Sequence, residues 1–277
     1  MSSARVGIGY QPICEVEDLI FETAGRSQVA GGLLLISSFD LPFIGAAAFV
    51  AALVGSVAGS GGTALLLPVL TLYFGVGDAI PILTIANFSS NLGRAWFNRR
   101  EVVLPVVGWF SLGSIPLALT GAMLFVVSSP DLLTRILGAF LLLTVAWRRL
   151  GIKVASFSSP QWFAPLGAAF GLLNGLLEGI GPIMAPFFLA SGLVRGAYIG
   201  TDALATVFMQ GSKLTVLGGT SIIDSSILAS GLTLVPFMFA GAFAGKKVVD
   251  YVSDAFFIMV IDITLLCSGI SFLFANR

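Results

Sequence analysis

Long stretches of the chain contain no charged residue. Asp, Glu, Lys and Arg are absent from residues 41–77 (37 residues), 102–130 (29), 154–177 (24) and 225–245 (21). A helix needs about 20 apolar residues to cross a hydrocarbon core about 30 Å thick. Each stretch is long enough to do so, and the pattern predicts an all-α polytopic membrane protein.

Glycine, proline and charged residues divide these stretches into segments. The first apolar block, about 41–74, is interrupted at 55–63 by the sequence GSVAGSGGT. A corresponding block at about 161–192 is interrupted at 178–182. Three helices are expected after each block: about 79–97, 102–127 and 132–147 in the first half, and about 196–218, 225–245 and 255–275 in the second.

The two halves repeat one order of segments, which indicates an internal duplication. An offset of 117–120 residues pairs these landmarks: Pro68 with Pro186, Thr84 with Thr201, Pro116 with Pro236, and Gly121 with Gly241. We therefore expect a polar N-terminal arm (1–38) and two pseudo-symmetric repeat halves (39–153 and 154–277). Each half would hold one glycine-broken helix plus three spanning helices.

The relative orientation of the halves depends on the broken block. The halves are parallel if the block crosses the membrane, and inverted if it folds back as a re-entrant hairpin. Basic clusters adjoin the tryptophans that would mark a membrane interface, and the positive-inside rule assigns this side to the cytoplasm: Arg94, Arg99, Arg100, Arg148, Arg149 and Lys153, with Trp96, Trp147 and Trp162. Only the hairpin interpretation also places Lys246 and Lys247 there, which favours inverted halves.

Composition excludes several classes of protein. Of the 277 residues, 57% are hydrophobic and 10% charged, and the mean hydropathy is +1.00, whereas soluble domains carry about 25% charged residues. A soluble enzyme, a nucleic-acid-binding protein and a disordered chain are therefore excluded. The chain has no histidine, and Cys14 and Cys267 lie far apart, so we expect no metal site, cofactor or disulfide framework.

The two glycine-rich breaks are candidate binding elements. Irregular backbone inside a membrane protein is tolerated around a cavity or within protein. Short helices would start after each break, and their free N–H groups favour an anionic ligand. The amide donors would come from Gly59, Gly61, Gly62 and Thr63 in the first break, and from Gly179 and Gly181 in the second. The alternative is that these glycines only permit close helix packing.

Polar residues recur at helical spacing in two otherwise apolar segments. One ladder is Thr84, Asn87, Asn91 and Arg94, and the other is Asp202, Thr206, Gln210 and Lys213. Lipid cannot solvate such groups, so both faces should point into the protein or a wet pathway. Hydrogen bonds between helices, worth about 0.6 kcal/mol each, are the alternative role. Asn and Thr fit that role better than the charged residues do.

Glu178 lies within the second break and has two interpretations. It could be a protonatable carboxyl that carries a proton with the substrate. It could instead be a fixed salt-bridge partner of Lys213 or Arg94, with no part in transport. Asp202 is a second candidate for proton coupling, and both interpretations of Glu178 stay open at this point.

Short motifs are shared by the two halves. They are GSGGTALLLP at 59–68, followed by Thr84 and the Arg99-Arg100 loop, and GIGPIMAP at 179–186, followed by Gly200-Thr201. In these motifs the chain resembles the TauE/SafE sulfite exporter family of membrane transporters, over about residues 41–275. The resemblance implies a secondary transporter of small anions, often sulfur-containing, in the cytoplasmic membrane. Glu178 departs from the family pattern, in which an uncharged residue, commonly glycine, is expected.

The expected function is alternating-access transport of a small anion, namely a sulfur oxyanion, an organosulfonate or a small carboxylate. Backbone amides would hold the anionic group, Asn87, Asn91, Thr201 and Gln210 would donate hydrogen bonds, and Arg94 or Lys213 would supply positive charge. Expected partners are that anion and the lipid bilayer, with a homodimer left open and no nucleic acid. A channel is the main alternative, followed by a membrane-embedded enzyme or a scaffold subunit.

Overall fold

The protein is helical throughout the described part of the computed structural model, which covers residues 41–57, 62–151, 159–193 and 195–248 and a few positions between 266 and 273. Its elements are α2 (Leu41–Val57), α3 (Gly62–Phe97), α4 (Leu104–Val127), α5 (Pro130–Arg149), the short 3₁₀ helix η1 (Pro160–Trp162), α6 (Phe163–Leu176), α7 (Gly181–Ala190), α8 (Arg195–Gly219) and α9 (Ser225–Val248). The all-α prediction is confirmed. The expected N-terminal arm and most of the expected helix 255–275 lie outside the described residues.

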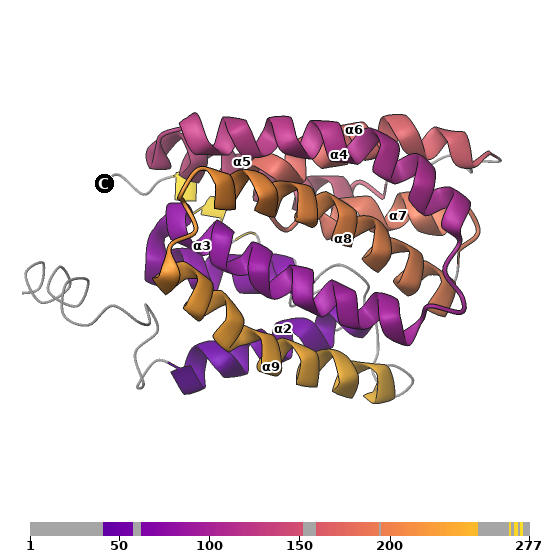
Figure 1. Ribbon diagram of the computed structural model, residues 1–277, viewed down its shortest axis with the longest axis horizontal. Coiled ribbons are helices and arrows are strands. Elements are labelled where there is room, and N and C mark those ends of the chain that lie inside the picture. Colours follow the sequence, from indigo (N-terminus) through magenta and orange to yellow (C-terminus); the bar gives the residue numbers. More distant parts are fainter. Residues whose placement is uncertain are drawn as a thin grey trace, which may run out of the picture.

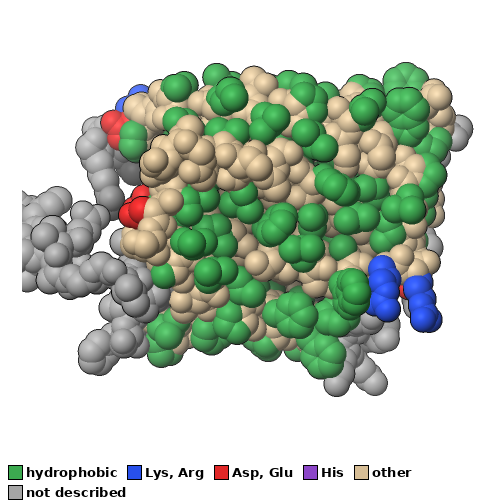
Figure 2. Space-filling view, in the orientation of Figure 1, with side chains coloured by type: hydrophobic (Ala, Val, Ile, Leu, Met, Phe, Trp, Pro, Cys, Tyr) green, Lys and Arg blue, Asp and Glu red, His purple; other side chains and the backbone are tan. Residues whose placement is uncertain are grey.

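Several helices are long and apolar enough to cross a membrane. They are α3, α4, the Pro130–Trp147 part of α5 and the Ser225–Gly245 part of α9. On the face in Figure 2, charged side chains gather at the two ends of the molecule, and the surface between them is apolar. This distribution is the one that a bilayer requires, because its core cannot solvate charge. The prediction of a polytopic membrane protein is confirmed.

The helices lie side by side in the order α6, α4, α8, α3, α9 and α2 (Figure 1). In the view of Figure 1, α4 and α6 form the top of the molecule and α2 and α9 the bottom, with α3 and α8 between them. The two helices with polar ladders, α3 and α8, therefore occupy the middle. Their buried polar side chains include Thr84, Asn87, Asn91, Asp202, Gln210 and Lys213.

The first broken block folds back as a hairpin. The start of α3 lies against the end of α2, because a Cβ atom at Gly62 would overlap the Ala51 carbonyl. The first part of α3 then runs antiparallel to α2, which brings the ring of Tyr73 within 6.1 Å of Phe43. Gly75 interrupts α3 with φ 74° and ψ 168°, and the second part of α3 reverses direction again. The range 62–97 therefore contains two helical parts on either side of Gly75, which agrees with the two segments expected.

The second broken block forms another hairpin. Helix α6 ends at Leu176, and Gly179, with φ 81°, turns the chain into α7. Helix α7 returns beside α6, so that the rings of Phe188 and Phe163 lie 5.0 Å apart. The break predicted at 178–182 is therefore observed one or two residues earlier, between the end of α6 and the start of α7.

The two hairpins enter from opposite ends of the molecule. Helix α4 starts at the end that carries Arg99, and α6 runs parallel to α4, since Gly167 lies against Phe110 and Gly175 against Ala118. Helix α2 instead starts at the end that carries Asp78. This geometry is the one expected of inverted halves, whereas an internal duplication stays a prediction.

Helix α9 ends where the hairpin interpretation required. It runs parallel to the second part of α3, because Gly231 lies against Ile85 and the rings of Phe97 and Phe239 are 5.5 Å apart. The end of α9, with positions 246 and 247, therefore lies at the Arg99 end. Trp96 and Trp162 are exposed near that end, which suits an aromatic belt.

A seam of glycines joins α4 and α6. Gly113 and Gly121 of α4, and Gly167, Gly171 and Gly175 of α6, each face the backbone of the other helix so closely that a Cβ atom would overlap a carbonyl oxygen. Small residues at four-residue spacing allow such close approach in membranes. This seam fixes α6, and with it the second break, against α4.

Gly171→Ala is expected to lower the apparent melting temperature of the detergent-solubilised protein. The added methyl group would overlap the Ser114 carbonyl, and overpacking of this kind costs about 1–3 kcal/mol. Gly108→Ala in α4 is the matched control, because nothing lies within 4 Å of a Cβ atom there. Equal melting temperatures for the two variants would contradict a tight seam.

Asp224 caps the start of α9. Its carboxylate accepts hydrogen bonds from the Ile227 N–H (2.8 Å) and the Ser226 hydroxyl (2.6 Å). These two bonds hold the pKa of the Asp224 carboxyl below its ordinary value. Asp224 is therefore the N-cap of α9, and the cap is strongest when its carboxyl group is ionised.

Asp224→Ala should destabilise the protein by about 1 kcal/mol at neutral pH, as loss of an N-cap does. Because the folded pKa is lowered, the stabilisation is complete above the unfolded value of about 3.9 and is lost as pH falls through the folded value. Melting temperatures of parent and variant should converge in acid. Asp224→Asn, which keeps a capping oxygen, is the control, and a difference that stays constant down to acidic pH would argue against a charged cap.

Candidate functional site

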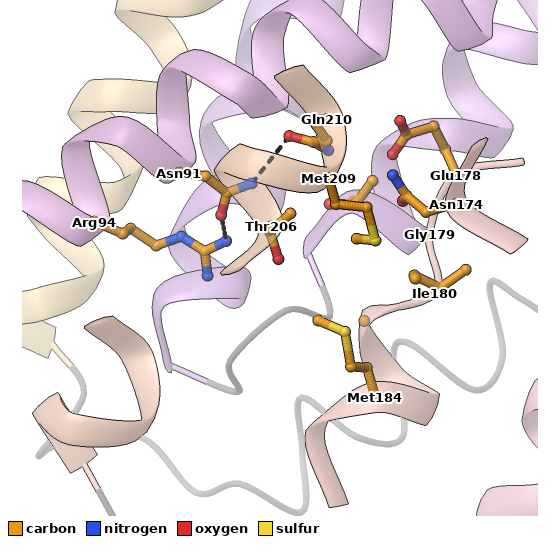
Figure 3. A pocket seen from close by; sticks show the side chains of 12 residues that line it. Asn91, Arg94, Asn174, Glu178, Gly179, Ile180, Met184, Thr206, Met209 and Gln210 are labelled. Carbon is orange, nitrogen blue, oxygen red and sulfur yellow. Dashed lines mark hydrogen bonds between the residues drawn. The ribbon is translucent and has the colours of Figure 1, made fainter. Parts of the chain in front are cut away.

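A small cavity lies between the second break and the two middle helices (Figure 3). Its free volume is about 20 Å³, which is room for about one water molecule. It is lined by Thr63, Asn91, Arg94, Asn174, Glu178, Gly179, Ile180, Gly181, Met184, Thr206, Met209 and Gln210. Many of the predicted site residues thus meet at one place, although they come from α3, the second hairpin and α8.

The starts of the two half-helices meet beside this cavity. A Cβ atom at Gly179 would lie 3.5 Å from Cα of Ala64, and Thr63 lines the same cavity as Gly179 and Gly181. The N–H groups of Ile183 and Met184 already donate to the Ile180 carbonyl, and Pro182 has no N–H. The backbone N–H of Gly181, at the first position of α7, is therefore the donor that this helix start can offer. Gly62 is buried against α2 rather than at the cavity. Gly59 and Gly61 lie outside the described residues.

Arg94 reaches the cavity through a chain of polar side chains. The Asn91 amide donates to the Gln210 side-chain oxygen (3.3 Å), which ties α3 to α8. The Arg94 guanidinium donates to the Asn91 oxygen (Figure 3). It also donates to the Gly55 carbonyl (3.4 Å). A guanidinium has five N–H donors, and Nε of Arg94 is buried without a partner. Arg94 therefore has donors left for a ligand.

Lys213 is fully buried, and its contacts are all with the protein. Its Nζ donates to the carbonyls of Asn174 (2.9 Å) and Leu177 (2.7 Å) and to Glu178 Oε1 (3.4 Å). Those carbonyls belong to the end of α6, where a cation satisfies both the orphan acceptors and the helix dipole. An ammonium group has three donors, and Lys213 uses all of them.

Glu178 is held by several partners. Besides Lys213, its carboxylate lies 2.9 Å from the Thr84 hydroxyl and 3.5 Å from the Asn87 amide nitrogen. Thr84 also lies 2.7 Å from the Ile80 carbonyl, and its single proton can be donated to only one of these acceptors. Asn87 accepts in turn from the Thr63 hydroxyl (3.3 Å). Of the salt bridges considered for Glu178, the one with Lys213 is present.

Within the part of the chain that the structure describes, several buried polar atoms at or near the cavity lack a hydrogen-bond partner. They are Nε of Arg94, Nδ2 of Asn174, Oγ1 of Thr206 and both carboxylate oxygens of Asp202. Buried polar groups are normally paired with protein or water. Three of these four residues line the cavity, so the site has unmet hydrogen-bonding capacity that a polar ligand could use.

Of the described residues predicted for the site, five do not line the cavity: Gly62, Asn87, Thr201, Asp202 and Lys213. The side chain of Asn87 lies between Thr63 and Glu178, accepting a hydrogen bond from the first and donating one to the second. Thr201 lies toward the Arg99 end, where its hydroxyl accepts from the Val103 N–H (3.0 Å). Thr201 thus joins the α3–α4 connection to α8 and does not line the cavity.

Sequence reasoning missed Asn174, which lines the cavity from α6. The available signal was a single amide in a long apolar stretch, four residues before Glu178. Met184 and Met209 also line the cavity, and nothing in their apolar surroundings marked them. Within the described ranges, no three His, Cys, Asp or Glu side chains are grouped as metal ligands would be.

Comparison with known proteins identifies the family. Residues 44–272 match the family described as sulfite exporter TauE/SafE. No curated protein and no solved structure matches the chain. The match spans both hairpins, both polar ladders and the cavity between them, and the chain belongs to the TauE/SafE sulfite exporter family of membrane transporters.

Proposed function

We propose that this protein is a secondary transporter that moves a small anion across the cytoplasmic membrane by alternating access. The observation that carries the proposal is Arg94, a cation with unused donors at a buried cavity that the start of α7 also lines. A guanidinium and helix N-terminal amides are both suited to an oxyanion. Membership of a sulfite exporter family supports the same ligand class.

The chemistry of the cavity favours a compact anionic group with several oxygen acceptors. Thr206 and Asn174 can add neutral hydrogen bonds to those from Arg94. The lining also includes Met184, Met209 and Ile180, which can contact a small apolar substituent. Sulfite, an organosulfonate or a small carboxylate meets these requirements.

The size of the cavity supports a conformational cycle. Its free volume of about 20 Å³ admits a water molecule, and an oxyanion is larger. The surrounding helices must therefore separate for binding and close again afterwards. Two hairpins entering from opposite ends around one central site are typical of alternating-access carriers.

Lys213 has a structural role in this proposal, and Arg94 is the cation that binds the anion. All three donors of Lys213 are engaged by the end of α6 and Glu178. Withdrawing Lys213 toward a ligand would leave two buried carbonyls and a carboxylate without their donor. Coupling of a proton through Glu178 stays a prediction.

Arg94→Gln should raise KM about 10- to 100-fold for saturable counterflow of radiolabelled sulfite in proteoliposomes. The expected loss is that of a charge-assisted hydrogen bond, about 1.5–3 kcal/mol. Arg99→Gln is the matched control, because Arg99 is an exposed arginine near the end of α3. Sulfonates and small carboxylates are tested in parallel.

An unchanged KM in folded Arg94→Gln protein would show that Arg94 does not bind the anion. A high, non-saturating conductance in the parent protein would instead indicate a channel.

Lys213→Met should lower stability rather than substrate affinity. Removing one partner of a buried ion pair costs about 3–5 kcal/mol, and here two helix-end carbonyls also lose their donor. Glu178→Gln combined with Lys213→Met should recover part of the loss, because no buried charge is then left alone. Melting temperature and counterflow KM are measured for both. A well-folded single variant with the KM defect of Arg94→Gln would make Lys213 a binding residue.

A further inference from the structure

Asp202 is a buried carboxyl group without a hydrogen-bond partner among the described residues. It lies on α8 one turn before Thr206, which lines the cavity, and its exposed fraction is 0%. Neither carboxylate oxygen accepts a hydrogen bond. An ionised carboxylate in such surroundings is strongly disfavoured unless a cation or donors compensate it, so its partner must be a proton or a group that reaches it in another conformation.

The elements packed against α8 contribute few charged groups that could stabilise an ionised Asp202. Helices α4, α6 and α7 contain no titratable residue at all. Helix α3 contributes Arg94, whose positive charge acts on Asp202. Glu101 adjoins Gly196 at the start of α8, and α8 itself carries Tyr198 one turn before Asp202 and Lys213 eleven residues after it.

Arg94 lines the cavity, and Asp202 lies on α8 one turn before the lining residue Thr206. Glu178 and Lys213 neutralise each other at 3.4 Å. Among the described residues, no ion pair joins Arg94 to Asp202, and Arg94 donates instead to Asn91 and Gly55. When an anion binds Arg94, an ionised Asp202 would become an excess buried negative charge. A proton on Asp202 restores neutrality.

We propose that Asp202 takes up one proton together with each anion that binds at Arg94, an inference that rests on the proposed function. The proton moves from water to a carboxylate oxygen of Asp202, and no covalent bond of the substrate changes. With the proton in place, Arg94 is free for the anion. When the anion leaves, the proton returns from Asp202 to water. The coupling residue is therefore Asp202, while Glu178 belongs to the fixed pair with Lys213.

The first test measures proton uptake by the purified parent protein in weakly buffered detergent with a pH-indicator dye. Methanesulfonate is the probe, with thiosulfate as a second, because their charges stay constant over the pH range used. About one proton should be taken up per anion bound, and affinity should fall about tenfold per pH unit where that uptake occurs. Anion binding without proton uptake overturns the inference, with no variant needed.

The second test uses Asp202→Asn, which resembles the protonated side chain. This variant should keep counterflow of the anion but lose proton uptake, the pH dependence of affinity and accumulation driven by a pH gradient. Asp224→Asn is the matched control: it removes a carboxyl group at the start of α9, and it should keep all three. A purely structural role of Asp202 would change stability without abolishing proton uptake.

The outcomes separate the inference from the proposed function. Proton uptake that persists in Asp202→Asn, or that is lost in Glu178→Gln but kept in Asp202→Asn, overturns the assignment to Asp202 and leaves anion transport intact. Absence of saturable binding and flux of sulfite, methanesulfonate and thiosulfate in the parent overturns the proposed function, and the inference with it.

Discussion

The structure depends on hydrogen bonds to the carbonyl groups at the end of α6, a helix that stops inside the protein. Helix α6 ends at Leu176, which lies beside Gly121 of α4, six residues before the end of that helix. The last carbonyls of α6 need donors that lipid cannot supply. Lys213 provides them, and Glu178 balances the charge of Lys213. Lys213 lies on α8, and Glu178 also contacts Thr84 of α3. The hydrogen bonds that stabilise the end of α6 therefore connect α6, α8 and α3 at the centre of the molecule.

The need for donors at the end of α6 gives different roles to two basic residues, Arg94 and Lys213, that have similar surroundings in the sequence. Arg94 and Lys213 each end a polar ladder in an otherwise apolar helix, and both were candidates to bind the substrate. The difference lies in how many donors the protein uses. The ammonium group of Lys213 has three N–H donors, and the protein engages all three. The guanidinium of Arg94 has five, and its contacts with Asn91 and Gly55 leave some of them unused. A binding role follows from unused hydrogen-bonding capacity rather than from charge alone.

The sequence predicted the helices, the breaks and the convergence of the ladders, because apolar length and three- to four-residue spacing are local properties. Thr63, Asn91, Arg94, Gly179, Gly181 and Gln210 do meet at one cavity. The partners of the charged residues were not predictable, because they depend on which helices become neighbours. Spacing could not reveal that Lys213 would cap α6 or that Thr201 would receive the Val103 N–H. Asn174 was missed because one amide in an apolar run has no periodic companion.

The inverted hairpins limit how the site can open. Helices α3 and α8 run antiparallel across the centre, joined at mid-length by the Asn91–Gln210 hydrogen bond. At the Arg99 end they are joined again, by the Thr201 contact with Val103 and by Asn98 against Gly200. The Glu178 contacts to Thr84 and Lys213 hold the second break from the other side. In the proposed alternating-access cycle, opening toward the Arg99 end requires the Thr201 and Asn98 contacts to break but can spare the buried ion pair. Opening toward the Asp78 end must move the second hairpin together with Lys213, because separating the pair would strand two buried charges. In the proposed cycle, the ion pair therefore requires the second hairpin and α8 to move as one unit.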